Sequence, residues 1–95
     1  MDKKEKLDIY NSALTLFGFS NQRLMLVEEC GELLDVIAKI KRNRATIQQV
    51  ITELADVSIM VEQMAFFYGW DDFKAEKERK LMRLQERIIE KGGKP

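Results

Sequence analysis

Residues 24–68 read LMLVEECGELLDVIAKIKRNRATIQQVITELADVSIMVEQMAFFY, and this stretch decides the fold. Apolar residues recur in it at spacings of three and four, on both sides of a short polar link at Asn43-Arg44. Such spacing is typical of amphipathic helices. Because a short link makes two successive helices antiparallel neighbours, the stretch predicts a helical hairpin.

The residues before this hairpin predict one more helix. It covers about 3–17 and is followed by Gly18, a residue that commonly ends helices. One face of it carries Leu7, Tyr10, Leu14 and Phe17. The first hairpin helix then reaches about Arg42, and we expect Ser20 or Asn21 to cap its start.

The second half of the chain predicts two further helices. One covers 46–68, with Thr46 as its cap, and the other covers 71–90, with Asp71 or Asp72 as its cap. Gly69 separates them. The sequence therefore predicts an all-α fold of four helices, with antiparallel central helices.

Composition limits the class of protein. The 95 residues predict one domain, 1–95, with a flexible tail over about 91–95. Basic and acidic residues both number 16, so the chain lacks the basic excess of a protein that binds nucleic-acid polymers. No apolar run approaches the length of a membrane span or signal core, so we expect a cytoplasmic protein without a membrane partner.

Two acidic turns interrupt the apolar faces of the predicted hairpin. Glu29 and Glu32 lie three residues apart on one helix, and Glu53 and Asp56 lie three apart on the other. Other acidic pairs share this spacing, and the ordinary interpretation of each is a solvated face with partners four residues away. At about 100° per residue, however, each of these two pairs straddles the edge of an apolar face.

Four carboxylates on facing helices would repel one another, by roughly 3 kcal/mol for two charges about 6 Å apart at an effective dielectric near 20. A divalent cation would remove this repulsion. Histidine is absent and Cys30 is the only cysteine, so the ligands would all be oxygen atoms. Such a set favours Mg²⁺, with Mn²⁺ as a substitute, over zinc or copper.

The run Leu26-Val27-Glu28-Glu29-Cys30-Gly31-Glu32-Leu33, followed by Glu53-Leu54-Ala55-Asp56-Val57, resembles the MazG family of all-α nucleoside triphosphate pyrophosphohydrolases. The family pattern is E-x-x-E, a spacer, then E-x-x-D. The resemblance extends from about Leu24 to Arg87 and includes one copy of the motif set, as in the compact, single-domain members. It implies a four-helix MazG-like bundle that assembles as a homodimer or homotetramer.

The resemblance also implies an activity. Glu29, Glu32, Glu53 and Asp56 would ligate magnesium, and Glu28 would help bind a further ion or orient water. A nucleoside triphosphate would be cleaved between its α and β phosphates, giving the monophosphate and pyrophosphate. An implied role is nucleotide-pool housecleaning, the removal of non-standard or surplus deoxynucleotides.

Basic residues follow one another at spacings of three in the predicted last helix. Lys77, Lys80 and Arg83 are candidates for binding the triphosphate. Nearby glutamates make local salt bridges the simpler interpretation of the same residues.

Two other classes of function stay open. The chain could be a non-catalytic helical module whose apolar faces form an oligomer and whose acidic residues pair with a partner. It could also be a metal-dependent regulator that binds nucleotide without cleaving it.

Overall fold

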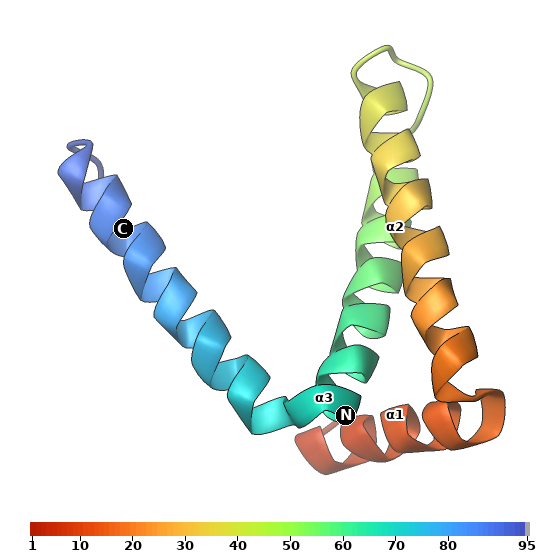
Figure 1. Ribbon diagram of the computed structural model, residues 1–95. Coiled ribbons are helices and arrows are strands. Elements are labelled where there is room, and N and C mark those ends of the chain that lie inside the picture. Colours follow the sequence, from red (N-terminus) through yellow and green to blue (C-terminus); the bar gives the residue numbers. More distant parts are fainter. Residues whose placement is uncertain (95) are drawn as a thin grey trace.

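The computed structural model describes residues 1–94, and these residues form helices and no strands. Helix α1 spans Lys3–Phe17, α2 spans Phe19–Ile40 and α3 spans Ile47–Glu90. Figure 1 shows α2 and the first half of α3 side by side and antiparallel, with α1 across their lower end and the second half of α3 pointing away. The all-α fold and the antiparallel hairpin expected from the sequence are confirmed.

Gly18 makes the corner between α1 and α2. Its φ of 91° lies in the left-handed region that favours glycine, and its amide donates to the carbonyl of Leu14. Helix α2 begins directly afterwards, so the prediction that Ser20 or Asn21 caps it is wrong. Asn21 instead donates from Nδ2 to the carbonyl of Phe17, 2.8 Å away, and so covers the end of α1.

The link between α2 and α3 is closed by a capping box. Thr46 Oγ1 accepts a hydrogen bond from the Gln49 amide at 3.1 Å, and Gln49 Oε1 accepts one from the Thr46 amide at 2.7 Å. The predicted cap at Thr46 is therefore confirmed. Helix α2 ends at Ile40, two residues earlier than the sequence suggests.

Gly69 is the bend of α3. Its φ of 145° and ψ of 99° are non-helical, but helical hydrogen bonding continues past it, so the two helices expected here form one bent element. We call residues 47–68 the hairpin limb and residues 70–90 the arm. A side chain at position 69 would be strained, and a Cβ there would lie 3.3 Å from Asp72 Oδ2.

The best-buried residues lie where α1 crosses the hairpin. Tyr10 retains only 3 % of its accessible surface, and Met60, Met64 and Ala65 are also buried. Next to them Gln22 Nε2 donates to Gln63 Oε1 at 2.8 Å, which satisfies two buried amides. The core of the chain is therefore small and lies at one end of the hairpin.

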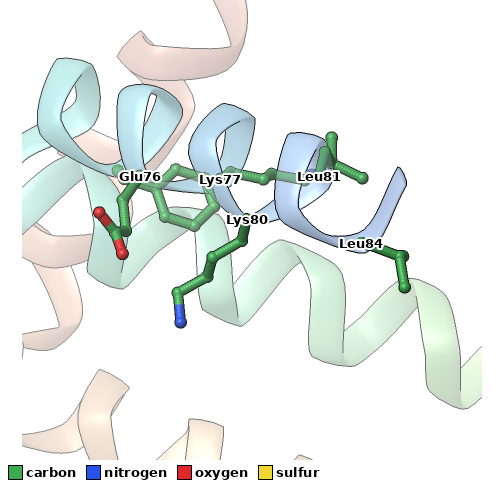
Figure 2. Close-up of a pocket in the computed structure, with 6 residues that line it drawn as sticks. Glu76, Lys77, Lys80, Leu81 and Leu84 are labelled. Carbon is green, nitrogen blue, oxygen red and sulfur yellow. The ribbon is translucent and has the colours of Figure 1, made fainter. Parts of the chain in front are cut away.

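The arm leaves this core (Figure 1). Residues 74–87 are all exposed, so the single chain does not enclose a fourth helix in a bundle. A groove of about 480 Å³ runs along the arm between Phe73 and Leu84, and Figure 2 shows its side chains. Beyond Glu90, the amides of Gly92 and Gly93 donate to the carbonyls of Ile89 and Ile88, which caps the helix; Pro95, in the predicted tail, lies outside the described residues.

None of the helices within residues 1–94 has both the length and the apolar character that crossing a membrane requires.

Tyr10 also fixes α1 to the hairpin limb through its hydroxyl. The hydroxyl donates to Glu62 Oε1 at 2.5 Å, and Lys6 Nζ lies 3.4 Å from the same oxygen. Burial of the Glu62 carboxyl acts to raise its pKa, but the hydrogen bond from Tyr10 and the charge of Lys6 outweigh it. The pKa of Glu62 therefore lies below its ordinary value of 4.5.

We predict that Tyr10→Phe lowers the free energy of unfolding by about 1.5–3 kcal/mol at pH 7, the usual range for a hydrogen bond to a charged group. Because the pKa of Glu62 is lowered by folding, this stabilisation is present above about pH 4.5 and is lost as the pH falls further. Urea denaturation at several pH values measures it. Tyr68→Phe is the control, since Tyr68 is 68 % exposed; equal losses in both variants would contradict the prediction.

Candidate metal centre

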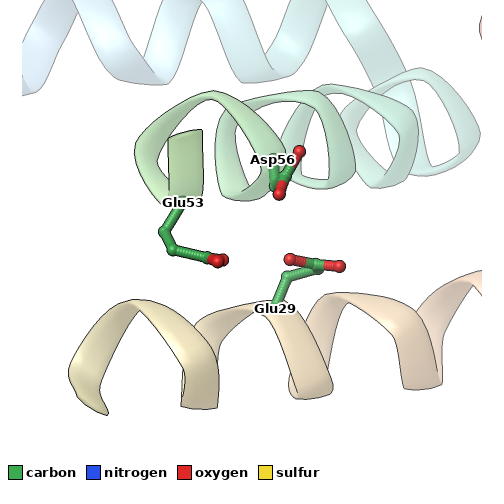
Figure 3. A group of neighbouring side chains, drawn as sticks. All are labelled: Glu29, Glu53 and Asp56. Atoms are coloured by element: carbon green, nitrogen blue, oxygen red, sulfur yellow. The ribbon is translucent and has the colours of Figure 1, made fainter. Parts of the chain in front are cut away.

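Antiparallel packing of α2 against the hairpin limb brings three carboxylates together. Glu29 projects from α2, and Glu53 and Asp56 project from α3, towards a common point between the two helices (Figure 3). One oxygen of each lies within 4.8 Å of the others. The two acidic turns of the sequence therefore do face one another.

Two oxygen atoms of this cluster are buried without a partner. Neither Glu29 Oε2 nor Glu53 Oε2 is accessible to solvent or hydrogen-bonded within the described part of the chain. A buried acceptor without a partner typically costs 1–3 kcal/mol and more when charged, so such groups call for an explanation. A cation between the helices would satisfy both oxygens.

Burial and neighbouring negative charge both disfavour the ionised carboxylates of the cluster. Burial raises the pKa of Glu29, and the negative charges of Glu32, Asp56 and Glu53 raise it further. Burial likewise raises the pKa of Glu53, as do the charges of Glu32 and Asp56. No lysine or arginine contributes to either shift. The positive charge that would keep these carboxylates ionised is not supplied by the chain itself.

Glu32 and Glu28 lie beside the cluster rather than in it. Both side chains are exposed, and neither belongs to the three that converge. Glu32 is nonetheless close enough for its charge to act on Glu29 and Glu53. The structure therefore separates the five acidic candidates into three that converge, one at the border and one on the outer surface.

The basic candidates lie elsewhere, on the arm. Lys77 and Lys80 line its groove, and the Lys77 ammonium lies 6.0 Å from the centre of the Phe73 ring. Arg83 is exposed and does not line the groove. Since the arm diverges from the hairpin (Figure 1), the single chain does not bring these residues to the carboxylates.

The apolar part of the groove was not singled out from the sequence. Leu81 and Leu84 line it beside the lysines, and Ile88 continues the same face of the helix. Their spacing of three and four was the available signal, and the density of charge around them obscured it.

The donor set fits a hard divalent cation. All its ligand atoms are carboxylate oxygens, which suit Mg²⁺ and Mn²⁺ and are poor for copper. The two buried oxygens without partners point to the same conclusion independently of any family pattern. Comparison of the chain with protein-family models, with curated proteins and with solved structures found no match.

We predict that Mg²⁺ stabilises the metal-free protein, because a ligand that binds only the folded state adds RT ln(1 + [L]/Kd), about 2.7 kcal/mol at 100 times Kd. Thermal unfolding with increasing Mg²⁺ measures the effect, and Mn²⁺ should reproduce it. Glu53→Gln should abolish the shift, while Glu86→Gln, on the exposed arm, should retain it. A shift of equal size in both variants would mean that the ion binds elsewhere.

A second prediction concerns pH in the absence of metal. Folding raises the pKa of Glu29, so its ionisation opposes folding; this cost is absent below about pH 4.5 and develops as the pH rises through the raised pKa. Glu29→Gln should therefore raise the melting temperature at pH 7 by a few degrees and leave it nearly unchanged at pH 4. Glu28→Gln, at the exposed neighbouring position, should show no such pH-dependent gain.

Proposed function

We propose that the protein is a magnesium-dependent nucleoside triphosphate pyrophosphohydrolase of the MazG-like type. The observation that carries the proposal is the convergence of Glu29, Glu53 and Asp56, with two buried oxygens that lack partners. The E-x-x-E and E-x-x-D pattern of the sequence supports it independently. Hydrolysis of a nucleoside triphosphate to the monophosphate and pyrophosphate would take place at this centre.

The chain's residues divide the work at such a centre. When bound, a magnesium ion offsets negative charge on phosphate oxygens and polarises the attacking water. Glu29, Glu53 and Asp56 would hold the cation between two helices whose packing fixes the positions of the carboxylates. In this proposal Glu32, at the border of the cluster, and Glu28, on the outer surface beside it, would accept hydrogen bonds from water and so orient it. No histidine or covalent nucleophile is needed.

Binding of the triphosphate is the second part of the proposal. The cluster is too acidic to attract a polyphosphate without the cation. Lys77, Lys80 and Arg83 remain the proposed cationic contacts of the triphosphate. They would reach a triphosphate at the carboxylate cluster only where an arm lies close to a hairpin. In this proposal the protein works in the cytoplasm as a homodimer or homotetramer, in which a bundle is completed between chains.

One observation favours a second function, that of a non-catalytic helical interaction module. Large apolar side chains are exposed along the hairpin and the arm, among them Leu34 at 71 % and Leu84 at 47 %. Such surfaces fit a protein whose role is assembly. They are also compatible with an oligomeric enzyme, so activity must be measured directly.

We predict that a panel of ribo- and deoxynucleoside triphosphates supplied with Mg²⁺ yields pyrophosphate rather than single phosphate. Chromatography of the nucleotide products, together with a pyrophosphate assay, identifies the bond that is cleaved. Glu53→Gln should lower kcat/KM by about 100-fold or more, since even groups that support metal ligands are typically worth 10- to 100-fold.

Glu86→Gln is the matched control and should retain full activity. Binding of nucleotide without turnover would favour a regulator over an enzyme. Equal rates for wild type and Glu53→Gln would exclude the proposed centre.

A further inference from the structure

The turn that joins α2 to α3 carries a concentration of positive charge. Residues 36–52 contain four basic and no acidic side chains, whereas the rest of the chain contains 12 basic and 16 acidic ones. One of the four, Lys39, pairs with Asp35 at 2.7 Å. The other three form no ion pair within residues 1–94, and we call them the basic tip: Lys41, Arg42 and Arg44.

The backbone of this turn is fixed by hydrogen bonds. The amides of Arg42 and Arg44 both donate to the carbonyl of Lys39, at 3.0 and 2.9 Å, and the Asn43 amide donates to the carbonyl of Ile40 at 3.1 Å. Asn43 has a φ of 58°, in the left-handed region that asparagine tolerates better than most residues. All three side chains of the basic tip are exposed. Figure 1 shows the turn at the end of the hairpin remote from α1, so the three cations lie on a defined, projecting turn.

The helix ends that meet at this turn do not offset its charge. The C-terminus of α2 and the N-terminus of α3 carry partial charges of opposite sign, each about half an elementary charge, so their effects largely cancel. The first turn of α3 has no acidic residue. Along the chain, the nearest acids are Glu53 and Asp35, and Asp35 already pairs with Lys39. The basic tip therefore presents an uncompensated positive charge to anions outside the chain.

The surroundings of the basic tip select among polyanions. Residues 20–65 contain no phenylalanine, tyrosine or tryptophan, so the tip has no ring on which the bases of a single strand could stack. The rest of the chain has four more acidic than basic residues, and Glu53 lies only about 9 Å along α3 from Ile47. A long nucleic-acid duplex or an anionic bilayer would bring its charge against these acids as well. A partner whose negative charge is confined to a short segment avoids this repulsion.

Carboxylates suit the two arginines of the basic tip. A guanidinium presents two parallel N–H donors to a carboxylate, so one such pair gains two charge-assisted hydrogen bonds. We propose that the basic tip docks a partner protein by binding a short acidic segment, whose Asp or Glu carboxylates pair with Lys41, Arg42 and Arg44. The inference concerns an interaction surface and does not depend on the proposed enzymatic activity.

The first experiment titrates a hexaglutamate peptide into the metal-free, ¹⁵N-labelled protein at low salt and follows the amide NMR signals. The signals of residues 41–46 should move most, and the dissociation constant should rise with added salt, which screens exposed charges. Arg42→Gln combined with Arg44→Gln should raise the dissociation constant about 10-fold, because two exposed ion pairs are lost.

Arg87→Gln combined with Lys91→Gln is the matched control. It removes the same charge from exposed positions at the far end of the arm, so it should leave the dissociation constant nearly unchanged. Equal dissociation constants for the two double variants would overturn the proposal. So would the absence of any shift, or larger shifts at residues 77–83 of the arm than at the turn.

Two further probes distinguish an acidic protein segment from other polyanions. A short DNA duplex and phosphatidylserine vesicles are titrated in the same way, into the wild type and into the Arg42→Gln, Arg44→Gln variant. Neither should show binding that the variant weakens. Binding of the duplex or the vesicles that depends on the two arginines and is tighter than that of the peptide would overturn the proposal in favour of nucleic acid or membrane.

Thermal unfolding shows whether the arginines instead have a structural role. The hydrogen bonds that fix the turn come from the backbone, and the three cations repel one another. Arg42→Gln combined with Arg44→Gln should therefore leave the melting temperature unchanged or slightly raised. A fall of more than a few degrees would mean that the arginines stabilise the turn, and it would overturn the proposal.

Discussion

The structure depends on the short connection that turns α2 back onto α3. Six residues and one capping box at Thr46 favour antiparallel contact between the two helices, and the structure shows that contact. That contact decides which residues become neighbours: Glu29 meets Glu53 and Asp56 because they lie at similar distances from the turn. The same contact places Gln22 opposite Gln63 further along. The candidate site and the small core are thus set by one turn.

The carboxylate cluster works against the stability of the chain that contains it. Burial and mutual repulsion raise the pKa values of Glu29 and Glu53, and hydrophobic burial is modest because only four apolar residues among residues 1–94 are well covered. A protein of this size has a small margin of stability, of the order of 5–10 kcal/mol. Retaining several acids between two helices therefore suits a cation-binding role better than a structural one.

The sequence predicted the features that rest on local chemistry. The helical segments, the Thr46 cap and the bend at Gly69 follow from periodicity and from residues with strong conformational preferences, although the two helices expected around Gly69 form one bent element. Helical periodicity also indicated that Glu29, Glu53 and Asp56 face one another, but it counted Glu32 with them, and the structure leaves Glu32 at the border of the cluster. Prediction from the sequence failed where two local signals competed. Gly18 is the residue that precedes α2, so neither Ser20 nor Asn21 caps this helix. The sequence does not predict the direction of the arm, because this direction depends on two dihedral angles at Gly69 and on what covers the exposed apolar residues of α3.

Because those two dihedral angles set the direction of the arm, Gly69 acts as its pivot. The 21 residues of the arm extend about 31 Å beyond it, so a rotation of only 10° at this single residue moves the tip by about 5 Å. A small change in the dihedral angles of this one residue therefore produces a large displacement at Ile88. The reach and angle of the arm can consequently change through this pivot alone, with the carboxylate geometry of the hairpin left intact.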